Sequence, residues 1–355
     1  MQILSDYDIL NKNIEYLDKG EITIQIYRQK PELMLSLPRL LARLHPNNPM
    51  YKEIENQLYR IEAGYAGEKR VDKYIESIEF PTPVSILTDV HLPIAPKFSI
   101  QIDTLILTPS YAYILEIKNI AGTLSYISNP PHFECTYPDK TPILIDCPLL
   151  QLNNNKYGLD LWLERNGFPI RSSGLIVLAN QTLVKNVPDD MPILYAKHLQ
   201  QYFRTLAETE PKLSSTQYQR LVEVLNNNQN RYNPYPLTKR YQIRSEDIQK
   251  GALCKECLNG LQRINHVTWI CPVCKTKDRK PFIHGLQDWF MLIKPSISNE
   301  ECRDFLKLKD KFAANHVLKS MPLQRKGKSK STVYTWDYKN SPTEIEQKRK
   351  PSFNG

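Results

Sequence analysis

Hydrophobic residues between Pro49 and Glu79 recur at steps of three and four, the period of one helix face. This spacing predicts a long helix with an apolar stripe formed by Ile54, Leu58, Ile61, Tyr65, Val71, Ile75 and Ile78. Glu68 falls on the same stripe, between Tyr65 and Val71. A carboxylate on the core-facing side of a helix costs free energy unless it has a partner, so we expect Glu68 to have one.

Strand-like patterns follow this helix. The predicted elements are strands at 85–92, 98–107 and 111–119, β-prone pieces around 124–127 and 133–137, a helix at about 148–165 and a strand at 174–179. The last strand reads GLIVLA, a continuous apolar run typical of a strand buried on both faces. The order of helix, strands, helix and strand predicts an α/β fold with a mixed sheet. The chain then looks helical from about residue 195 to 228.

The strands on either side of residues 109–110 place charged side chains among apolar ones. Alternation puts Glu116 and Lys118 on one face of their strand, and Gln101 and Asp103 on one face of the other. If the strands pair as a hairpin that turns at 109–110, partners have numbers that sum to 219. Asp103 then lies opposite Glu116, and Gln101 opposite Lys118, with Cβ atoms ~4.5–5.5 Å apart.

Two opposed carboxylates in apolar strands repel each other and lose solvation, so one takes up a proton unless a cation lies between them. A divalent ion such as Mg²⁺ binds through one or two carboxylates together with waters and phosphate oxygens. The adjacent Lys118 can orient or activate a metal-bound water. This arrangement suits hydrolysis of a phosphodiester bond. The alternative is a surface ion pair between Glu116 and Lys118, which the apolar strands around it disfavour.

The spacing of these residues resembles that of a known nuclease superfamily. The letters ID, then twelve residues, then EIK (residues 102–118) resemble the PD-(D/E)XK motif. The wider string GYAGEKRV…ILTDVHL…QIDTLIL…YILEIKNIAGTL closely resembles the nuclease-related domain (NERD) of bacterial proteins, from about Gly64 to Ala179. The resemblance implies a restriction-endonuclease-like mixed sheet flanked by helices, and a metal-dependent nuclease activity.

The resemblance also implies roles for the clustered residues. Asp103 and Glu116 would bind Mg²⁺ or Mn²⁺, with the main-chain carbonyl of Ile117 as a third ligand. Lys118 would be the catalytic lysine. Ile102 replaces the proline of the superfamily's name, which hardly affects the chemistry because the carboxylate binds the metal.

Two further residues, Glu68 and Gln151, receive a role in the site only from the resemblance. Glu68 would be the helical acid that completes the site, and its alternative is a helix acid paired to a lysine or arginine. Gln151, with Asn155 one turn on, occupies the place where the family has a helix carrying a Gln near the site. The alternative for Gln151 is an ordinary residue on a helix surface.

Four of the seven cysteines form two CxxC pairs, CKEC at 254–257 and CPVC at 271–274, separated by thirteen residues. Two such pairs offer four thiolates, a closed tetrahedral shell for a structural Zn²⁺. The predicted ligands are Cys254, Cys257, Cys271 and Cys274. Zinc binding would supply the folding energy of a module too small for its own core, and the module resembles a zinc ribbon.

Beyond this module the sequence predicts two short helices, Ser298–Leu306 and Asp310–Met321, the first with a Ser298/Glu301 capping box. A β-prone stretch at 332–336 follows a basic segment. Two helices and a basic hairpin favour a winged-helix-like region, whose wing would contact the DNA backbone. The expected nucleic-acid contacts are Arg325, Lys326, Lys328 and Lys330. The alternative is a helical hairpin followed by a disordered basic tail.

Charge is unevenly spread along the 355 residues, whose net charge is +9. Residues 239–355 hold 24 Lys and Arg against 12 Asp and Glu, a net of +12, so the rest carries −3. This asymmetry indicates a polyanionic partner for the C-terminal third, or else a solvated basic surface. The only GKS triplet, at 327–329, has Pro322 where a phosphate-binding loop needs its first glycine, which argues against ATP hydrolysis.

The sequence thus predicts six segments and a cytoplasmic protein, because no apolar run approaches a membrane span, no secretory signal is visible and the cysteine count is odd. The segments are an N-terminal extension (1–48), the nuclease core (49–185), a helical segment with linker (186–236), the zinc ribbon (237–282), a basic helical or winged-helix region (283–340) and a disordered tail (341–355). The expected function is metal-dependent hydrolysis of nucleic acid, with DNA the expected substrate. The alternative is a catalytically silent nucleic-acid-binding or assembly protein with a nuclease-like fold.

Overall fold

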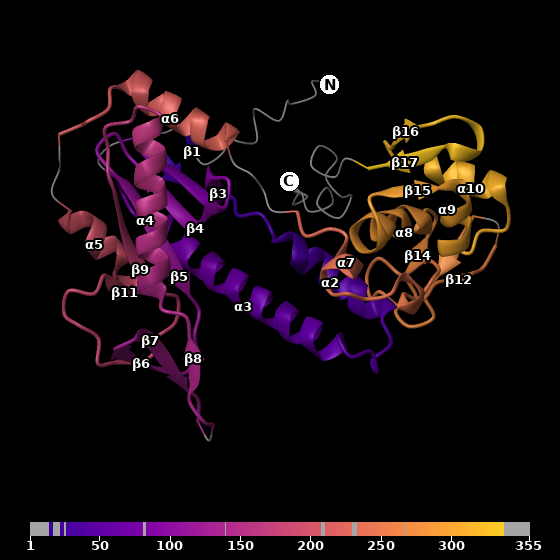
Figure 1. The fold of residues 1–355 in the computed structure, drawn as a ribbon, viewed down its shortest axis with the longest axis horizontal. Coiled ribbons are helices and arrows are strands. Elements are labelled where there is room, and N and C mark those ends of the chain that lie inside the picture. The colour runs from indigo at the N-terminus through magenta and orange to yellow at the C-terminus, as the bar shows by residue number, and fades with distance from the viewer. Residues whose placement is uncertain are drawn as a thin grey trace, which may run out of the picture. The chain divides into compact units, whose positions relative to one another are not determined.

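The structure, a computed structural model, describes residues 14–16, 22–24, 26–80, 83–138, 140–206, 210–228, 233–265 and 267–336. The chain divides into two compact units (Figure 1). The first combines the residues up to Gln29 with Glu62–Tyr232, and the second combines Lys30–Ile61 with the residues from Asn233 onward. Helix α3 (Tyr51–Ile75) supplies residues to both. Each unit is therefore assembled from stretches that are distant in sequence, which a linear division into six segments does not express. The six boundaries remain predictions, and the predicted tail at 341–355 lies outside the described residues.

A five-stranded mixed sheet, ordered β11-β9-β5-β4-β3, forms the centre of the first unit. Its strands are β3 (Ser85–Ala95), β4 (Phe98–Leu107), β5 (Ala112–Lys118), β9 (Ser172–Leu178) and β11 (Ile193–Tyr195). The pairs β3–β4 and β4–β5 are antiparallel, whereas β9 runs parallel to both β5 and β11. The mixed sheet predicted from the sequence is confirmed.

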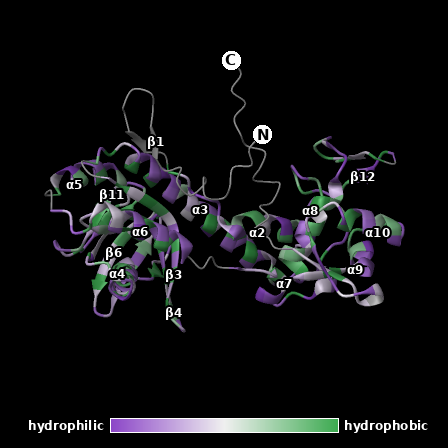
Figure 2. Ribbon diagram, turned by 90° about the horizontal axis from the view of Figure 1, so that it is seen from above, coloured by the Kyte–Doolittle hydropathy of each residue, from purple (hydrophilic) through white to green (hydrophobic). Residues whose placement is uncertain are grey.

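Helices cover both faces of this sheet. Helices α4 (Pro148–Arg165) and α6 (Ser215–Asn227) share one apolar core with the sheet, whose members include Ile102, Ile114, Leu152, Ile176 and Leu221. The C-terminal half of α3 and helix α5 (Leu199–Thr205) share a second core, whose members include Val71, Ile106, Leu115, Val177 and Phe203. Figure 2 shows hydrophilic and hydrophobic segments alternating along α3, as expected of a helix with one buried face. The fold class of helices flanking a mixed sheet is therefore as predicted.

The register of the central hairpin matches the prediction. Thr104 pairs with Leu115, and Leu107 with Ala112, so the paired numbers sum to 219. The long helical stretch predicted at 195–228 is wrong in its middle. It divides into α5 and α6, because Pro211 cannot continue a helix by hydrogen bonding and Ser214 starts a new one with a capping box.

A smaller sheet of the first unit follows the main one along the chain. Its order is β10-β6-β7-β8, with bounds Val184–Lys185, Thr123–Ser128, Pro131–Thr136 and Ile143–Ile145. Strands β6 and β7 form a hairpin that corresponds to the two predicted β-prone pieces. Two further short strands, β1 (Ile14–Tyr16) and β2 (Ile22–Ile24), pair near the N-terminus.

The second unit contains the cysteine module and the basic C-terminal region. Its helices are α2 (Glu32–Arg43), the start of α3, α7 (Leu237–Arg240), α8 (Pro281–Asp288), α9 (Asn299–Phe305) and α10 (Lys311–Leu318). Three short strands, β12 (Gln262–Arg263), β13 (Trp269–Ile270) and β14 (Lys277–Asp278), form an antiparallel sheet in the cysteine module. A second sheet, β15-β17-β16, has the bounds Ser296–Ser298, Val333–Thr335 and Gln324–Lys326.

The C-terminal elements follow the order helix, strand, helix, helix and hairpin (α8, β15, α9, α10, β16–β17; Figure 1). The capping box of α9 is formed as predicted, since the amide of Glu301 donates to Ser298 Oγ and the amide of Ser298 donates to Glu301 Oε2. The predicted hairpin after two helices is present in the described residues, so this region has the winged-helix-like order rather than a helical hairpin followed by a tail.

Helix α2 was not recognised in the sequence, and a buried ion network explains why it belongs to the second unit. Arg39 and Arg43 both pair with Asp288 at the end of α8, and all three side chains are almost fully buried. Arg43 also donates to the carbonyls of Gln249 and Gly251. These partners lie more than two hundred residues from α2, a distance over which helix periodicity carries no information.

Over the ranges that the structure describes, helices long and apolar enough to cross a membrane are absent.

Candidate active site and metal centre

The central hairpin brings Asp103 and Glu116 to facing positions at the end of its ladder. The pairing of β4 with β5 ends at Thr104 and Leu115, one residue before the two acids. Beyond this point a side chain replaces the main-chain pairing, since Asp103 Oδ2 accepts a hydrogen bond from the Ile117 amide at 2.7 Å. The two strands therefore separate at the acids, with one carboxylate held by the neighbouring strand's backbone.

Glu116 is completely buried and bonded on both oxygens. Lys118 Nζ lies 2.7 Å from Glu116 Oε1, and Asn155 Nδ2 lies 3.4 Å from Oε2. Lys118 also donates to Gln151 Oε1 at 3.0 Å, and Asn155 donates to the Gln101 carbonyl at 2.7 Å. Helix α4 thus presents Gln151 and Asn155 to the same cluster of residues as the hairpin.

Glu68 enters from helix α3 and has the partner that its position on the apolar stripe requires. Its Oε2 lies 2.9 Å from Arg28 Nη1, and its side chain is 25% exposed. Burial raises the pKa of Glu68 to about 7; the charge of Arg28 opposes this rise, whereas that of Asp103 adds to it. From the sequence, pairing with a lysine or arginine was the alternative to a role of Glu68 in the site, and the pair with Arg28 is present. The effect of the Asp103 charge on the pKa of Glu68 shows that the two acids also interact.

The two strand acids are also hard to ionise together. Burial raises the pKa of Glu116 to about 7, and the charge of Asp103 adds to the rise. Burial likewise raises the pKa of Asp103, although Lys118 and the Ile117 amide oppose it. A divalent cation would remove this repulsion, so the donor set fits one. Among the described residues, however, three acids with donor atoms within 4.8 Å of one another do not occur here. A cation would therefore bind through one or two carboxylates, with waters and a main-chain carbonyl.

A fourth acid, Asp89, was missed in the sequence. In β3, Thr88 pairs with Thr104 and Val90 with Ile102, so Asp89 lies opposite Asp103. Its backbone is left-handed, with φ of 51°, which is uncommon for a residue with a side chain and often marks a functional constraint.

The carboxylate of Asp89 has two partners on its own and the next strand. Its Oδ1 lies 2.9 Å from His91 Nε2 and 3.0 Å from Gln101 Nε2. Bonding to His91 lowers the pKa of Asp89 against the effect of burial. The same pairing argument, applied to the predicted strands 85–92 and 98–107, would have found Asp89. In that register Asp89 is the residue opposite Asp103, and it is an acid.

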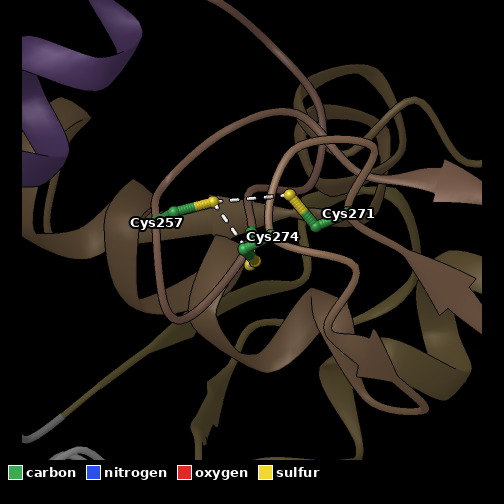
Figure 3. Close-up of side chains that lie close together, drawn as sticks. Cys257, Cys271 and Cys274 are labelled. Atoms are coloured by element: carbon green, nitrogen blue, oxygen red, sulfur yellow. Dashed lines mark hydrogen bonds between the residues drawn. The ribbon is translucent and has the colours of Figure 1, made fainter.

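The four CxxC cysteines of the second unit lie close enough together to hold a metal ion, and Figure 3 shows three of them, Cys257, Cys271 and Cys274. Their sulfur atoms lie within 4.8 Å of one another. Cys257 Sγ is 3.4 Å from Cys271 Sγ and 3.5 Å from Cys274 Sγ, and Cys254 Sγ is 3.5 Å from Cys274 Sγ. A tetrahedral ion with metal–sulfur bonds of ~2.3 Å places sulfurs about 3.8 Å apart, so four thiolates at these positions fit Zn²⁺.

Each CxxC pair forms the same kind of turn. The amides of Leu258 and Lys275 donate to the carbonyls of Cys254 and Cys271, respectively, at 3.0 Å. Leu258 and Lys275 have φ of 59° and 61°, so both chains turn back after the second cysteine. These matched turns aim both thiols of each pair at one point, which is why the short spacing within each pair identified the group correctly.

The predicted nucleic-acid contacts lie on the β16–β17 hairpin. Arg325 and Lys326 belong to β16 and Lys328 follows it, and all three are exposed. Gly327 has φ of 87° and a Cβ there would meet the Ser331 carbonyl oxygen at 2.5 Å, so the hairpin needs glycine at its turn. The side chain of Lys330, the fourth predicted contact, lies outside the described part.

Comparison with known proteins bears on the first unit. Residues 63–179 match the family model of the nuclease-related domain, NERD, over about a third of the chain. Curated proteins and solved structures gave no match. The matched range contains Glu68, Asp103, Glu116, Lys118 and Gln151. Over residues 63–179 the chain therefore matches the nuclease-related domain, and its second unit carries a four-cysteine group that could hold a metal ion.

Proposed function

We propose that the protein is a Mg²⁺- or Mn²⁺-dependent nuclease that hydrolyses phosphodiester bonds of nucleic acid, with DNA as the substrate. The observation that carries the proposal is the buried Glu116, bonded to Lys118 and facing Asp103, inside a nuclease-related domain. Buried acids with raised pKa values beside a lysine are expensive to maintain in a fold, and they are typical of catalytic sites.

Each residue has a role in this proposal. Asp103 and Glu116 hold the cation, which, when bound, stabilises charge on the attacked phosphate and lowers the pKa of a bound water. Without a cation, Lys118 donates to Glu116. When a cation neutralises Glu116, the ammonium of Lys118 would be free to donate to a water or a phosphate oxygen instead. Gln151 holds Lys118 from the α4 side, and Glu68 supplies a further acid at the edge of the cluster.

The second unit would serve binding and structure. We propose that Cys254, Cys257, Cys271 and Cys274 hold a structural Zn²⁺, since four thiolates leave no coordination position for a substrate. The exposed basic residues of the β16–β17 hairpin would contact phosphates of the nucleic acid.

The second candidate function is a silent nucleic-acid-binding or assembly protein. The salt bridge between Lys118 and Glu116 favours this candidate to a degree, because it occupies both groups when no cation is bound. The presence of both acids together with the lysine favours the enzyme.

Incubation with linear duplex, circular duplex and single-stranded DNA, each with Mg²⁺, Mn²⁺ or a chelator, tests the choice. We expect cleavage of at least one substrate with Mg²⁺ or Mn²⁺ and none with the chelator. Tight binding without cleavage of any of the three would favour the silent protein. Parallel RNA substrates would show whether DNA is the preferred substrate.

The basic hairpin gives a separate prediction about binding. Charge reversal of Lys326 and Lys328 to glutamate should weaken DNA binding and reduce the slope of log K against log salt by about one unit per lost phosphate contact. Cleavage at saturating DNA should persist. Reversal of Lys52 and Lys239, two exposed lysines of the same unit, changes the net charge equally and serves as the control. Equal slopes for the hairpin variant and the wild type would show that the hairpin does not contact phosphates.

A further inference from the structure

A short stretch outside the nuclease-related domain is bound to it residue by residue. The amide of Ile26 donates to Glu76 Oε1 at 2.9 Å. The carbonyl of Tyr27 accepts from Thr88 Oγ1 at 3.4 Å, and the carbonyl of Arg28 accepts from the Tyr65 hydroxyl at 3.4 Å. All three partners lie within the matched range 63–179, whereas residues 26–28 precede it by about 35 residues. We call residues 26–28 the strap.

The strap directs one side chain, Arg28, inward. The guanidinium is 1% exposed, and its five N–H donors all have acceptors. Nε and Nη2 bind the Asp72 carboxylate at 3.0 and 2.9 Å, and Nη2 also binds Thr104 Oγ1 at 2.6 Å. Nη1 binds Glu68 Oε2 and the main-chain carbonyl of Asp103, both at 2.9 Å.

These contacts divide into two groups. Asp72 is the buried counter-ion that makes it possible for a charged group to lie inside the fold. Glu68 and the Asp103 peptide belong to the cluster of acids, and they come from two different elements, α3 and β4. Arg28 is therefore the group that ties the helix acid to the strand that carries Asp103. A planar fork with five fixed donors suits this task, and the single ammonium of a lysine does not.

We propose that Arg28 is a positioning residue of the active site, which holds the Glu68 carboxylate and the Asp103 peptide at a fixed separation. The strap is then a functional part of the site, although it lies about 35 residues before the start of the matched range 63–179. This inference rests on the proposed nuclease function. It implies that the nuclease-related domain needs residues from outside its own range to cleave at full rate.

Three single variants test the proposal in the full chain: Arg28→Lys, Glu68→Gln and Asp72→Asn. Arg28→Lys should lower kcat about 10- to 100-fold, the loss typical of a small displacement of catalytic groups, and leave KM within about threefold. Asp72→Asn is the matched control: it weakens the other buried pair of Arg28, while the asparagine oxygen can still accept from the guanidinium and Glu68 remains as a counter-ion, so we expect the contacts to Glu68 and the Asp103 carbonyl to persist. Its kcat should remain within about threefold of wild type.

The double variant Arg28→Lys/Glu68→Gln separates positioning from general stability. If Arg28 acts through Glu68, the combined loss of kcat is clearly smaller than the product of the two single losses. Thermal unfolding of each variant shows that it is folded at the assay temperature. If Arg28→Lys does not fold, the double variant Arg28→Gln/Asp72→Asn takes its place, because it neutralises the buried pair together and removes the guanidinium that contacts Glu68 and the Asp103 carbonyl. Its kcat should be about 10- to 100-fold lower than that of Asp72→Asn alone.

The outcomes distinguish this inference from the proposed function. A wild-type protein that cleaves no substrate overturns the proposed function, and the positioning role with it. A cleaving wild type in which Asp72→Asn loses as much kcat as Arg28→Lys, or in which the losses of the double variant multiply in full, overturns the positioning role alone. If the double variant Arg28→Gln/Asp72→Asn is used instead, a kcat equal to that of Asp72→Asn has the same consequence.

Discussion

Glu116→Gln should abolish Mg²⁺-dependent cleavage while the protein stays folded. The substitution keeps the shape of the side chain and one oxygen that accepts from Lys118, whereas the amide nitrogen cannot accept the 3.4 Å contact from Asn155. It removes the negative charge that would hold the cation. Because a cation site with two carboxylates loses half of its charge, we expect a loss of at least about 10³-fold in kcat/KM, or about 4 kcal/mol of transition-state stabilisation. The measurement is single-turnover cleavage of the substrate that the wild type prefers.

The same variant should change the pH dependence of stability in the metal-free protein. The pKa of Glu116 is about 7 in the folded state and about 4.5 when unfolded, so the folded state binds more protons between these values. Stability contributed by this group is therefore lost as pH rises through this window. Glu116→Gln has no such group, so it should be at least as stable as wild type at pH 8 without metal, and the advantage should disappear at pH 5.

Glu164→Gln serves as the control, because Glu164 is an exposed acid on α4 outside the cluster. It should cleave like wild type. Full activity in Glu116→Gln would show that Glu116 is not a metal ligand. A Glu116→Gln protein that is much less stable than wild type at pH 8 would contradict the electrostatic account.

Cys271→Ser should remove the zinc and unfold the cysteine module locally. If the four thiolates form one closed site, the purified wild type carries about one Zn²⁺ per chain before a catalytic metal is added. Thiolates select zinc whereas carboxylates favour Mg²⁺ or Mn²⁺, so the two metals should be separable. The strands of this module have two residues each, so the metal supplies most of its folding energy, ~10–16 kcal/mol in zinc-finger peptides.

Elemental analysis and limited proteolysis together measure this effect. We expect new cleavage sites near residues 250–280 in Cys271→Ser and an intact first unit. Cys147→Ser is the control, because Cys147 lies at the N-cap of α4, where serine is favourable, and far along the chain from the cluster. Wild-type protein without zinc would refute the metal centre, and undiminished zinc in Cys271→Ser would refute the ligand set.

Short-range patterns in the sequence determined the elements and local geometry that matter most. The turn at residues 109–110 is sufficient for the 219 register, because the position and length of the turn set the pairing of a hairpin's two strands. The four-cysteine group follows from spacing alone, since each CxxC turn is a local structure. The Ser298/Glu301 capping box is likewise complete within four residues.

Only the tertiary structure decided which distant segments complete these local parts. Arg28 reaches Glu68 and Asp103 across 40 and 75 residues, and α2 reaches Asp288 across more than two hundred. Neither the period of a helix nor the alternation of a strand extends over such separations, and a buried arginine resembles any surface arginine in the sequence. A buried charge requires a partner of opposite charge or a hydrogen-bonding group, so these contacts depend on the complete fold. The sequence by itself was enough to predict the strand acids, the lysine and the cysteines as site residues. The packing of distant segments decided which residues hold them in place.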